Sequence, residues 1–99
     1  GVRLFPEGEA NAYGYHLLQE GKADEAVIVF QMNVDAYPKS ANTYDSLSDA
    51  YLAAGNRTEA LRFAEKALHA LASDTASSDE FKAQIRESAE RKVAELKKR

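Results

Sequence analysis

The sequence predicts an all-α protein in which antiparallel helix hairpins stack side by side. The clearest signal is residues 41–68, where two amphipathic segments flank a break at Gly55-Asn56. A second signal is a self-similarity at about 34 residues, which brings Gly21 onto Gly55 and Ala26 onto Ala60. The third is a long apolar stripe near the end of the chain with no glycine in it. Together they predict five helices, at residues 8–20, 24–37, 41–54, 58–72 and 78–97.

Residues 1–6 (GVRLFP) precede the first helical pattern, and Pro6 disfavours helix just before it. We expect an extended arm or the remnant of a linker there, with a disordered tail as the alternative. The chain starts with Gly rather than Met, so we expect a piece cut from a longer protein. The first hairpin follows, and its expected inward-facing residues are Ala10, Tyr13, Gly14, Leu17 and Leu18, then Ala26, Val27, Phe30, Val34 and Tyr37.

Local sequence signals predict where these first two helices begin and end. Gly21 is placed to end the first helix, and Asp24 can cap the second. Pro38 then closes the second helix, since the residue before a proline avoids helical geometry.

In the second hairpin the inward-facing stripes contain several small residues. Ala50, Ala60, Ala64 and Ala67 would let the two backbones approach closely. The larger members of the two stripes are Tyr44, Leu47, Tyr51 and Leu52, then Leu61 and Leu68.

The last segment, residues 75–99, is expected to form one helix that covers the second hairpin. Ser77 and Glu80 have the spacing of a capping box, and the apolar stripe contains Phe81, Ile85, Ala89, Val93 and Leu96. From Lys82 onward there are seven basic residues against three acidic ones. This excess offsets the helix dipole and is otherwise solvated, or it serves an acidic partner.

The matched positions resemble a tetratricopeptide repeat. A large, a small and a large residue recur at equivalent positions of the two segments: Tyr13 matches Leu47, Gly14 matches Ser48 and Leu17 matches Tyr51. The resemblance implies a short right-handed solenoid of two repeats, residues 7–40 and 41–74, plus the capping helix. Three positions depart from the pattern, where Ala10 matches Tyr44, Phe30 matches Ala64 and Pro38 matches Ala72.

In that family the first helices of successive repeats line a concave groove that holds an extended peptide or a partner helix. The resemblance therefore implies a non-enzymatic protein–protein interaction scaffold. The groove residues that it implies here are Asn11, Tyr15, Leu18, Gln19, Asn42, Asp45, Asp49, Leu52, Asp79 and Arg86. One subfamily grips a carboxylate with lysines and asparagines, but Asp45, Ser46 and Asp49 fill those positions in the second repeat. A basic or amide-rich ligand is expected instead.

Residues 5–70 are also similar to repeat tails that follow a hydrolase domain in some bacterial secreted proteins of the serine β-lactamase-like and α/β-hydrolase-like classes. The most specific part is Tyr37-Pro38 followed by residues 40–47. The alternative function is thus an accessory structural or self-association domain of a longer bacterial hydrolase. In that case the protein would be periplasmic or secreted. We also expect a homodimer, with Val2, Leu4, Phe5, Ile28 and Val29 covered by another copy.

Other functional classes are disfavoured. No nucleophile motif and no glycine-rich phosphate loop occurs, so we expect no enzyme activity and no cofactor. The chain has no cysteine, and its net charge of −3 gives no argument for nucleic acid or a membrane surface. His16 and His69 fall on different helices and are expected at the surface. Asp45 and Asp49 are interpreted as solvated or peptide-facing rather than as an acid–base pair or metal ligands.

Overall fold

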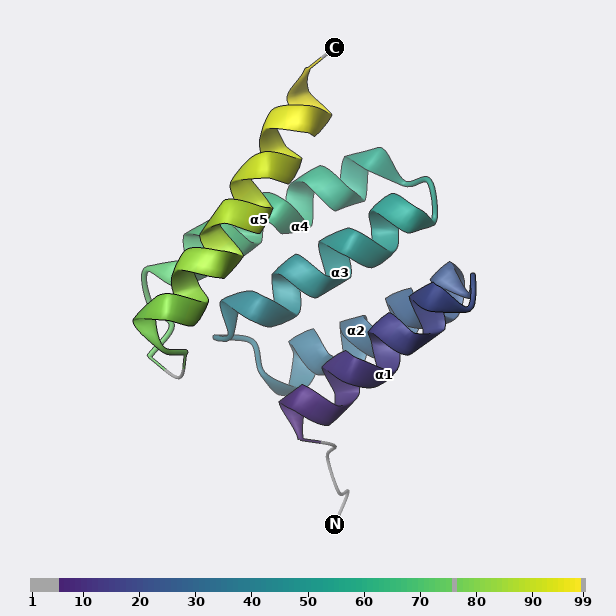
Figure 1. The fold of residues 1–99 in the computed structure, drawn as a ribbon, viewed down its shortest axis with the longest axis horizontal. Helices are drawn as coiled ribbons and strands as arrows, with labels where there is room; N and C mark the ends of the chain where they lie inside the picture. The colour runs from purple at the N-terminus through teal and green to yellow at the C-terminus, as the bar shows by residue number, and fades with distance from the viewer. Residues whose placement is uncertain (1–5, 76, 99) are drawn as a thin grey trace.

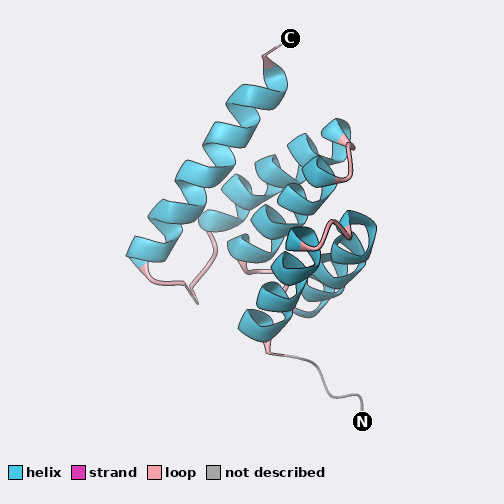
Figure 2. Ribbon diagram, turned by 45° about the vertical axis from the view of Figure 1, so that its right-hand side comes forward, coloured by secondary structure: helices cyan, strands magenta, loops and turns pink. Residues whose placement is uncertain are grey.

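The computed structural model describes residues 6–75 and 77–98, and their only regular secondary structure is α-helix (Figures 1 and 2). The helices are α1 (Glu7–Gln19), α2 (Ala23–Ala36), α3 (Ala41–Ala53), α4 (Arg57–Leu71) and α5 (Asp79–Lys97). Each boundary differs from the sequence prediction by at most one residue. The all-α class is therefore confirmed. The arm predicted from Val2, Leu4 and Phe5 lies outside the described residues.

Consecutive helices pack against each other, because each connection is too short to carry the chain elsewhere. α1 pairs with α2 and α3 with α4, while α5 packs on α4 and also reaches α3. In Figure 1, α1, α3 and α5 lie toward the viewer and α2 and α4 lie behind them. α3 therefore lies between α1 and α5 on the near side.

Both inter-helix turns of the hairpins contain the glycine that the sequence predicted. Gly21 and Gly55 have φ of 78° and 84°, which L-residues with a side chain rarely adopt. Two predicted helix N-caps, Asp24 and Ser77, are wrong, because each cap lies at a nearby position. α2 begins at Ala23, so Asp24 lies inside the helix and its side chain caps nothing. The cap of α5 is Ser78, whose hydroxyl accepts a hydrogen bond from the Phe81 N–H, while Ser77 instead donates to Asp74.

The main apolar core lies between the two hairpins and is built around Phe30, Leu47 and Phe63. Phe30 and Leu47 are fully buried. Gly14 brings α1 directly against the Phe30 ring, a closeness that leaves no room for a side chain. A smaller cluster joins α4 to α5 through residues that include Ala70, Leu71 and Ile85. The stacking of the helices thus depends on small residues at the crossings, as the sequence predicted.

Three residues predicted to face inward are exposed, and one of them, Leu52 on α3, was also assigned to the groove. Tyr13 on α1 is 56% exposed and Phe81 at the start of α5 is 39% exposed. Tyr13 matches the fully buried Leu47, but within the described residues no helix precedes α1 to cover it. Phe81 lies in the first turn of α5, beyond the part of the helix that buries Ile85. Burial at an end of a stack therefore does not follow from the residue pattern alone.

Replacing Ala60 by leucine is expected to lower the free energy of unfolding by about 1–3 kcal/mol, because the added methylenes overpack a filled crossing. Ala60 has no exposed surface, and its carbonyl accepts a 2.6 Å hydrogen bond from the buried Ser48 hydroxyl. Urea denaturation of the variant measures the loss. The exposed Ala12→Leu serves as the control, and an unchanged stability for Ala60→Leu would place Ala60 outside the core.

Candidate functional site at the α1–α3–α5 face

A buried polar network joins α5 to α3 on the near side of the molecule. The ammonium of Lys92 lies 2.8 Å from Oδ1 of Asp45 and 2.8 Å from Oδ1 of Asp49, and it donates to the Asp45 carbonyl oxygen at 2.9 Å. Ser88, one turn earlier on α5, donates to the Asp45 carboxylate at 3.0 Å. Lys92 is only 7% exposed. A buried lysine with three oxygen partners has all three of its protons satisfied.

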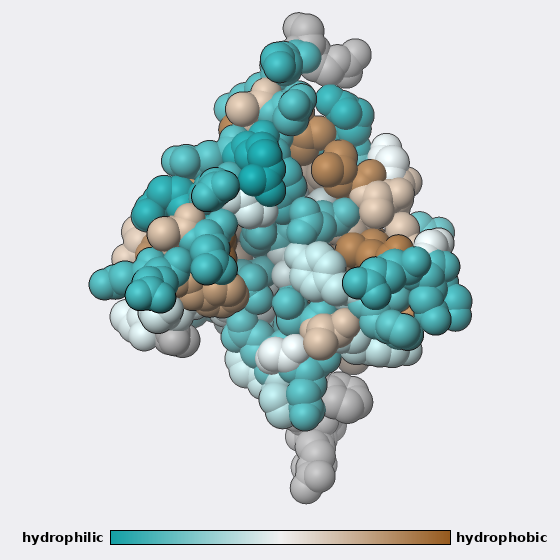
Figure 3. All heavy atoms as spheres, in the orientation of Figure 1, coloured by the Kyte–Doolittle hydropathy of each residue, from teal (hydrophilic) through white to brown (hydrophobic). Residues whose placement is uncertain are grey.

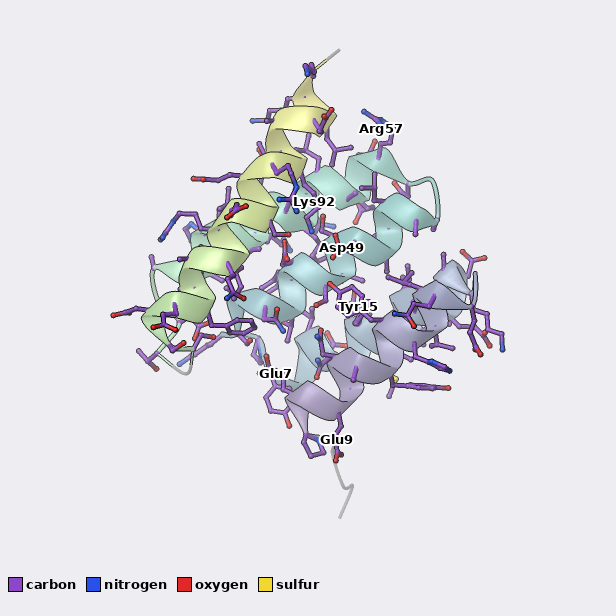
Figure 4. All side chains as sticks on the ribbon, viewed as in Figure 1. Glu7, Glu9, Tyr15, Asp49, Arg57 and Lys92 are labelled. Atoms are coloured by element: carbon purple, nitrogen blue, oxygen red, sulfur yellow. The ribbon has the colours of Figure 1, made fainter. Side chains whose placement is uncertain are left out.

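Tyr15 extends this network to α1. Its hydroxyl donates to Oδ2 of Asp49 at 2.5 Å, and its ring meets Phe30 edge to face at 5.1 Å. Burial, together with the nearby Asp49 carboxylate, raises the pKa of the Tyr15 hydroxyl well above its ordinary value. The hydroxyl therefore stays protonated and acts as a donor. Figure 4 shows Tyr15, Asp49 and Lys92 meeting between their three helices.

Further hydrogen bonds connect positions one predicted repeat apart. Tyr15 and Asp49 are separated by 34 residues, and the Ser46 hydroxyl bonds to the Asn11 side chain across 35. The Ser40 hydroxyl donates to Glu7, and the Ala41 N–H to Asp74, each across 33 residues. The α5 contacts differ, because Ser88 to Asp45 and Lys92 to Asp49 both span 43 residues. α5 thus packs on α3 in a different register from the one that relates α3 to α1.

One side of the molecule, the α1–α3–α5 face, carries Asn11, Tyr15, Asp45, Asp49, Ser88 and Lys92. Figure 3 shows that its centre is mostly hydrophilic, with apolar patches to either side. Leu18 and Gln19 follow Tyr15 by three and four residues, so they continue this face along α1. Asn42 and Leu52 do the same along α3, and the side chain of Leu52 is exposed.

Asp79 and Arg86 are not brought to this face. Arg86 precedes Ser88 by two residues, a step that turns a side chain to the other side of a helix. Asp79 follows the Ser78 cap at the very start of α5, about two and a half turns before Ser88. Both side chains are exposed. The charges of Asp79 and Arg86 therefore lie away from Asp45 and Asp49. Ser88 and Lys92 are the residues of α5 that contact these two carboxylates.

Lys92 was not among the residues predicted for the groove, although its position in the sequence indicates that it is buried. It follows Ile85 by seven residues and precedes Leu96 by four, so it interrupts the buried stripe Ile85, Ala89 and Leu96. A lysine at a core position needs a carboxylate partner. Asp45 and Asp49 were the candidates, but the sequence does not indicate which helix faces them.

The polar groups of this network are paired with one another. Two carboxylates and one ammonium leave a net charge of −1, and the Tyr15 hydroxyl is occupied as a donor. His16 and His69 are exposed as expected, and His16 pairs with Glu20 on its own helix at 3.4 Å. Among residues 6–75 and 77–98, no three His, Cys, Asp or Glu side chains gather closely enough to hold a metal ion. Nor is any helix of that part of the chain long and apolar enough to cross a bilayer.

Asp45 has an unusual titration. Burial raises the pKa of its carboxyl above the ordinary value, and the Lys92 ammonium, which acts in the opposite direction, offsets only part of the rise. The folded protein therefore binds this proton more tightly than the unfolded chain does. The stability cost of the ionised carboxyl is present above the folded-state pKa and disappears as the pH falls through it.

We therefore expect wild type to gain stability relative to Asp45→Asn as the pH falls from neutral toward about 4, the ordinary range of a carboxyl group. The asparagine cannot titrate, so the difference between the two free energies of unfolding isolates this proton. Urea denaturation of both proteins across that pH range measures the difference. If wild type instead loses stability relative to Asp45→Asn as the pH falls, the Lys92 ammonium outweighs burial in setting the pKa of Asp45.

Compared with models of protein families and with curated proteins, the sequence finds no match among either.

Proposed function

We propose that the chain is a non-enzymatic interaction scaffold of the tetratricopeptide type. In this proposal the α1–α3–α5 face holds an extended peptide or a partner helix. The observation that carries the proposal is the set of hydrogen bonds between residues 33 to 35 positions apart, Tyr15 to Asp49 among them. Contacts at a nearly constant separation are what a stack of equivalent hairpins produces, because each repeat touches only its neighbours.

The chemistry of the face supports a peptide ligand. Asn42 can donate to and accept from a peptide backbone. Leu18 and Leu52 add apolar surface beside the polar centre, and Leu52 is already exposed. The centre carries a net charge of −1, so a basic peptide is favoured, though less strongly than two unpaired carboxylates would favour it. Asp49 is the half-exposed member of the pair and is the one that a ligand can reach.

Selection from a random peptide library on the immobilised chain, followed by measured affinities for the enriched peptides, tests the proposal. Leu52→Lys places a positive charge on the α1–α3–α5 face and is expected to weaken binding at least tenfold, since it sets a like charge against a basic ligand and removes an apolar contact. Ile28→Lys is the matched control. It replaces another exposed aliphatic residue, on the opposite side of α2 from the core.

Either of two results would reject the proposal. One is a library that yields no enriched peptide. The other is an equal loss of affinity in Leu52→Lys and Ile28→Lys, which would mean that binding does not use the α1–α3–α5 face.

Self-association is a second candidate function, favoured by exposed apolar residues on the first hairpin. Ile28 and Met32 are 61% and 60% exposed, and their four-residue spacing makes them neighbours on the outer side of α2. Tyr13 on α1 is exposed as well. Large apolar side chains grouped at a surface are typical of contacts with another protein. In a self-association module the opposing surface would belong to a second copy.

If a second copy covers these residues, sedimentation is expected to show a mass that rises from monomer to dimer between micromolar and millimolar concentration. The double variant Ile28→Glu/Met32→Glu should remain monomeric throughout, because four like charges would face each other in the dimer. A wild-type protein that stays monomeric over the whole range would rule out this candidate.

A further inference from the structure

A pocket of about 540 Å³ lies between α4 and the connection from α2 to α3. Its lining shares no residue with the α1–α3–α5 face. It is formed by Pro38, Lys39, Tyr44, Arg62, Glu65, Lys66, His69, Ala70 and Ser73. This volume falls within the range of sites for small organic molecules, about 300–1,000 Å³.

The pocket is positively charged in an acidic protein. Arg62, Lys66 and His69 follow one another at spacings of four and three, so they form one stripe along α4. Lys39 joins them from the connection. Three cations against the single carboxylate of Glu65 leave a net charge of +2 with His69 neutral, whereas the whole chain carries −3.

Two of the three cations have no carboxylate partner. The Glu65 carboxylate is already paired with Lys97 of α5 at 3.0 Å, and Arg62 pairs with Glu59 at 2.9 Å. Within residues 6–75 and 77–98, neither Lys39 nor Lys66 forms an ion pair. Both ammonium groups can therefore serve an anion that enters the pocket.

Two of the three cations contact the ring of Phe63. The guanidinium carbon of Arg62 lies 5.3 Å from the centroid of the Phe63 ring, and the Lys66 ammonium lies 5.0 Å from it. Phe63 itself stacks on Tyr44, whose hydroxyl donates to the Pro38 carbonyl at 2.6 Å. The connection that carries Lys39 is thus tied to the same aromatic group. A ring contact, unlike an ion pair, leaves the N–H donors available.

We propose that this pocket binds a phosphate monoester, either as a free organic phosphate or as a phosphorylated side chain on a peptide. A phosphate monoester carries a charge of about −1.5 to −2 and three acceptor oxygens, so it matches several cations better than a carboxylate with one charge and two oxygens does. Arg62 can donate in fork geometry, while Lys39 and Lys66 act as point charges. Pro38, Tyr44 and Ala70 provide apolar walls for the organic part. The proposal is independent of the α1–α3–α5 face.

Amide chemical-shift titrations of the whole chain test the proposal. The probes are inorganic phosphate, O-phosphoserine, and one serine peptide with and without its phosphate. Saturable shifts are expected at Lys39, Arg62, Lys66 and His69 with the phosphorylated probes. Tighter binding of the phosphopeptide than of O-phosphoserine would identify a peptide as the source, and the reverse order a small molecule. Either order supports the pocket.

The variants Lys39→Gln and Lys66→Gln are each expected to weaken binding about threefold to fivefold, the usual effect of one exposed charge. Lys22→Gln is the matched control, since it removes an exposed lysine from the turn between α1 and α2 and should leave the affinity unchanged. The proposal is overturned if no saturable shift appears at concentrations on the order of 10 mM, a limit that corresponds to very weak binding. It is overturned equally if Lys22→Gln weakens binding as much as Lys66→Gln, which would indicate only a general charge effect.

Discussion

Replacing Lys92 by methionine is expected to lower the free energy of unfolding by about 3–5 kcal/mol, the usual cost of breaking a buried ion pair from one side. Methionine fits the space of the lysine stem, so the loss comes from the charge and not from a cavity. In the variant the buried Asp45 carboxylate keeps its Ser88 hydrogen bond but loses its cation at 2.8 Å. Urea denaturation at neutral pH measures the change.

Lys97→Met on the same helix is the control for this experiment. Lys97 also pairs with a carboxylate, Glu65 at 3.0 Å, but both side chains are about half exposed. Such a surface pair contributes less than about 1 kcal/mol. The double variant Asp45→Asn/Lys92→Met removes both charges and is expected to recover part of the loss. If Lys92→Met costs no more than Lys97→Met, the network does not stabilise the packing of α5.

Gly14→Ala is expected to destabilise the first hairpin by about 1–3 kcal/mol, even though alanine is the better helix former. A Cβ at Gly14 would lie 2.5 Å from Cζ and 2.7 Å from Cδ1 of the Phe30 ring, and closer still to Cε1. Phe30 is fully buried, so its ring cannot move aside without disturbing the core between the hairpins. Thermal or urea denaturation measures the effect.

Gly8→Ala makes the same chemical change six residues earlier on α1, and here a Cβ would meet no atom within 4 Å. Its expected result is a stability that is unchanged or raised by up to about 1 kcal/mol, from helix propensity alone. The opposite signs of the two variants separate packing from propensity. A stabilising Gly14→Ala would mean that α1 and α2 do not cross as closely as described.

The two candidate binding regions lie on different elements and use opposite charges. The α1–α3–α5 face has a net negative centre at Asp45, Asp49 and Lys92, whereas the pocket beside α4 is positive. A variant of Lys39 or Lys66 should therefore leave peptide binding at Leu52 unaffected. This separation allows the two proposals to fail independently.

The sequence by itself determined the helices and the turns between them. Helical periodicity, together with Gly21 and Gly55, placed every helix boundary within one residue, because these signals act between residues close along the chain. It also identified the small residues at the crossings, Gly14 and Ala60 among them. The resemblance assigned Tyr15 and Asp49 to one groove, and these residues, 34 positions apart, share a hydrogen bond, as equivalent positions of stacked hairpins can.

Only the tertiary structure decided what the charged residues of the α1–α3–α5 face contact. α5 packs on α3 across 43 residues and not 34, and this shift puts Lys92 and Ser88 beside Asp45 while Arg86 turns away. It also decided that Tyr13 and Phe81, at the two ends of the stack, stay exposed. The physical reason is that a residue pattern specifies which side of a helix is buried, but the neighbour that buries it, and in which register, depends on packing between segments far apart in the chain.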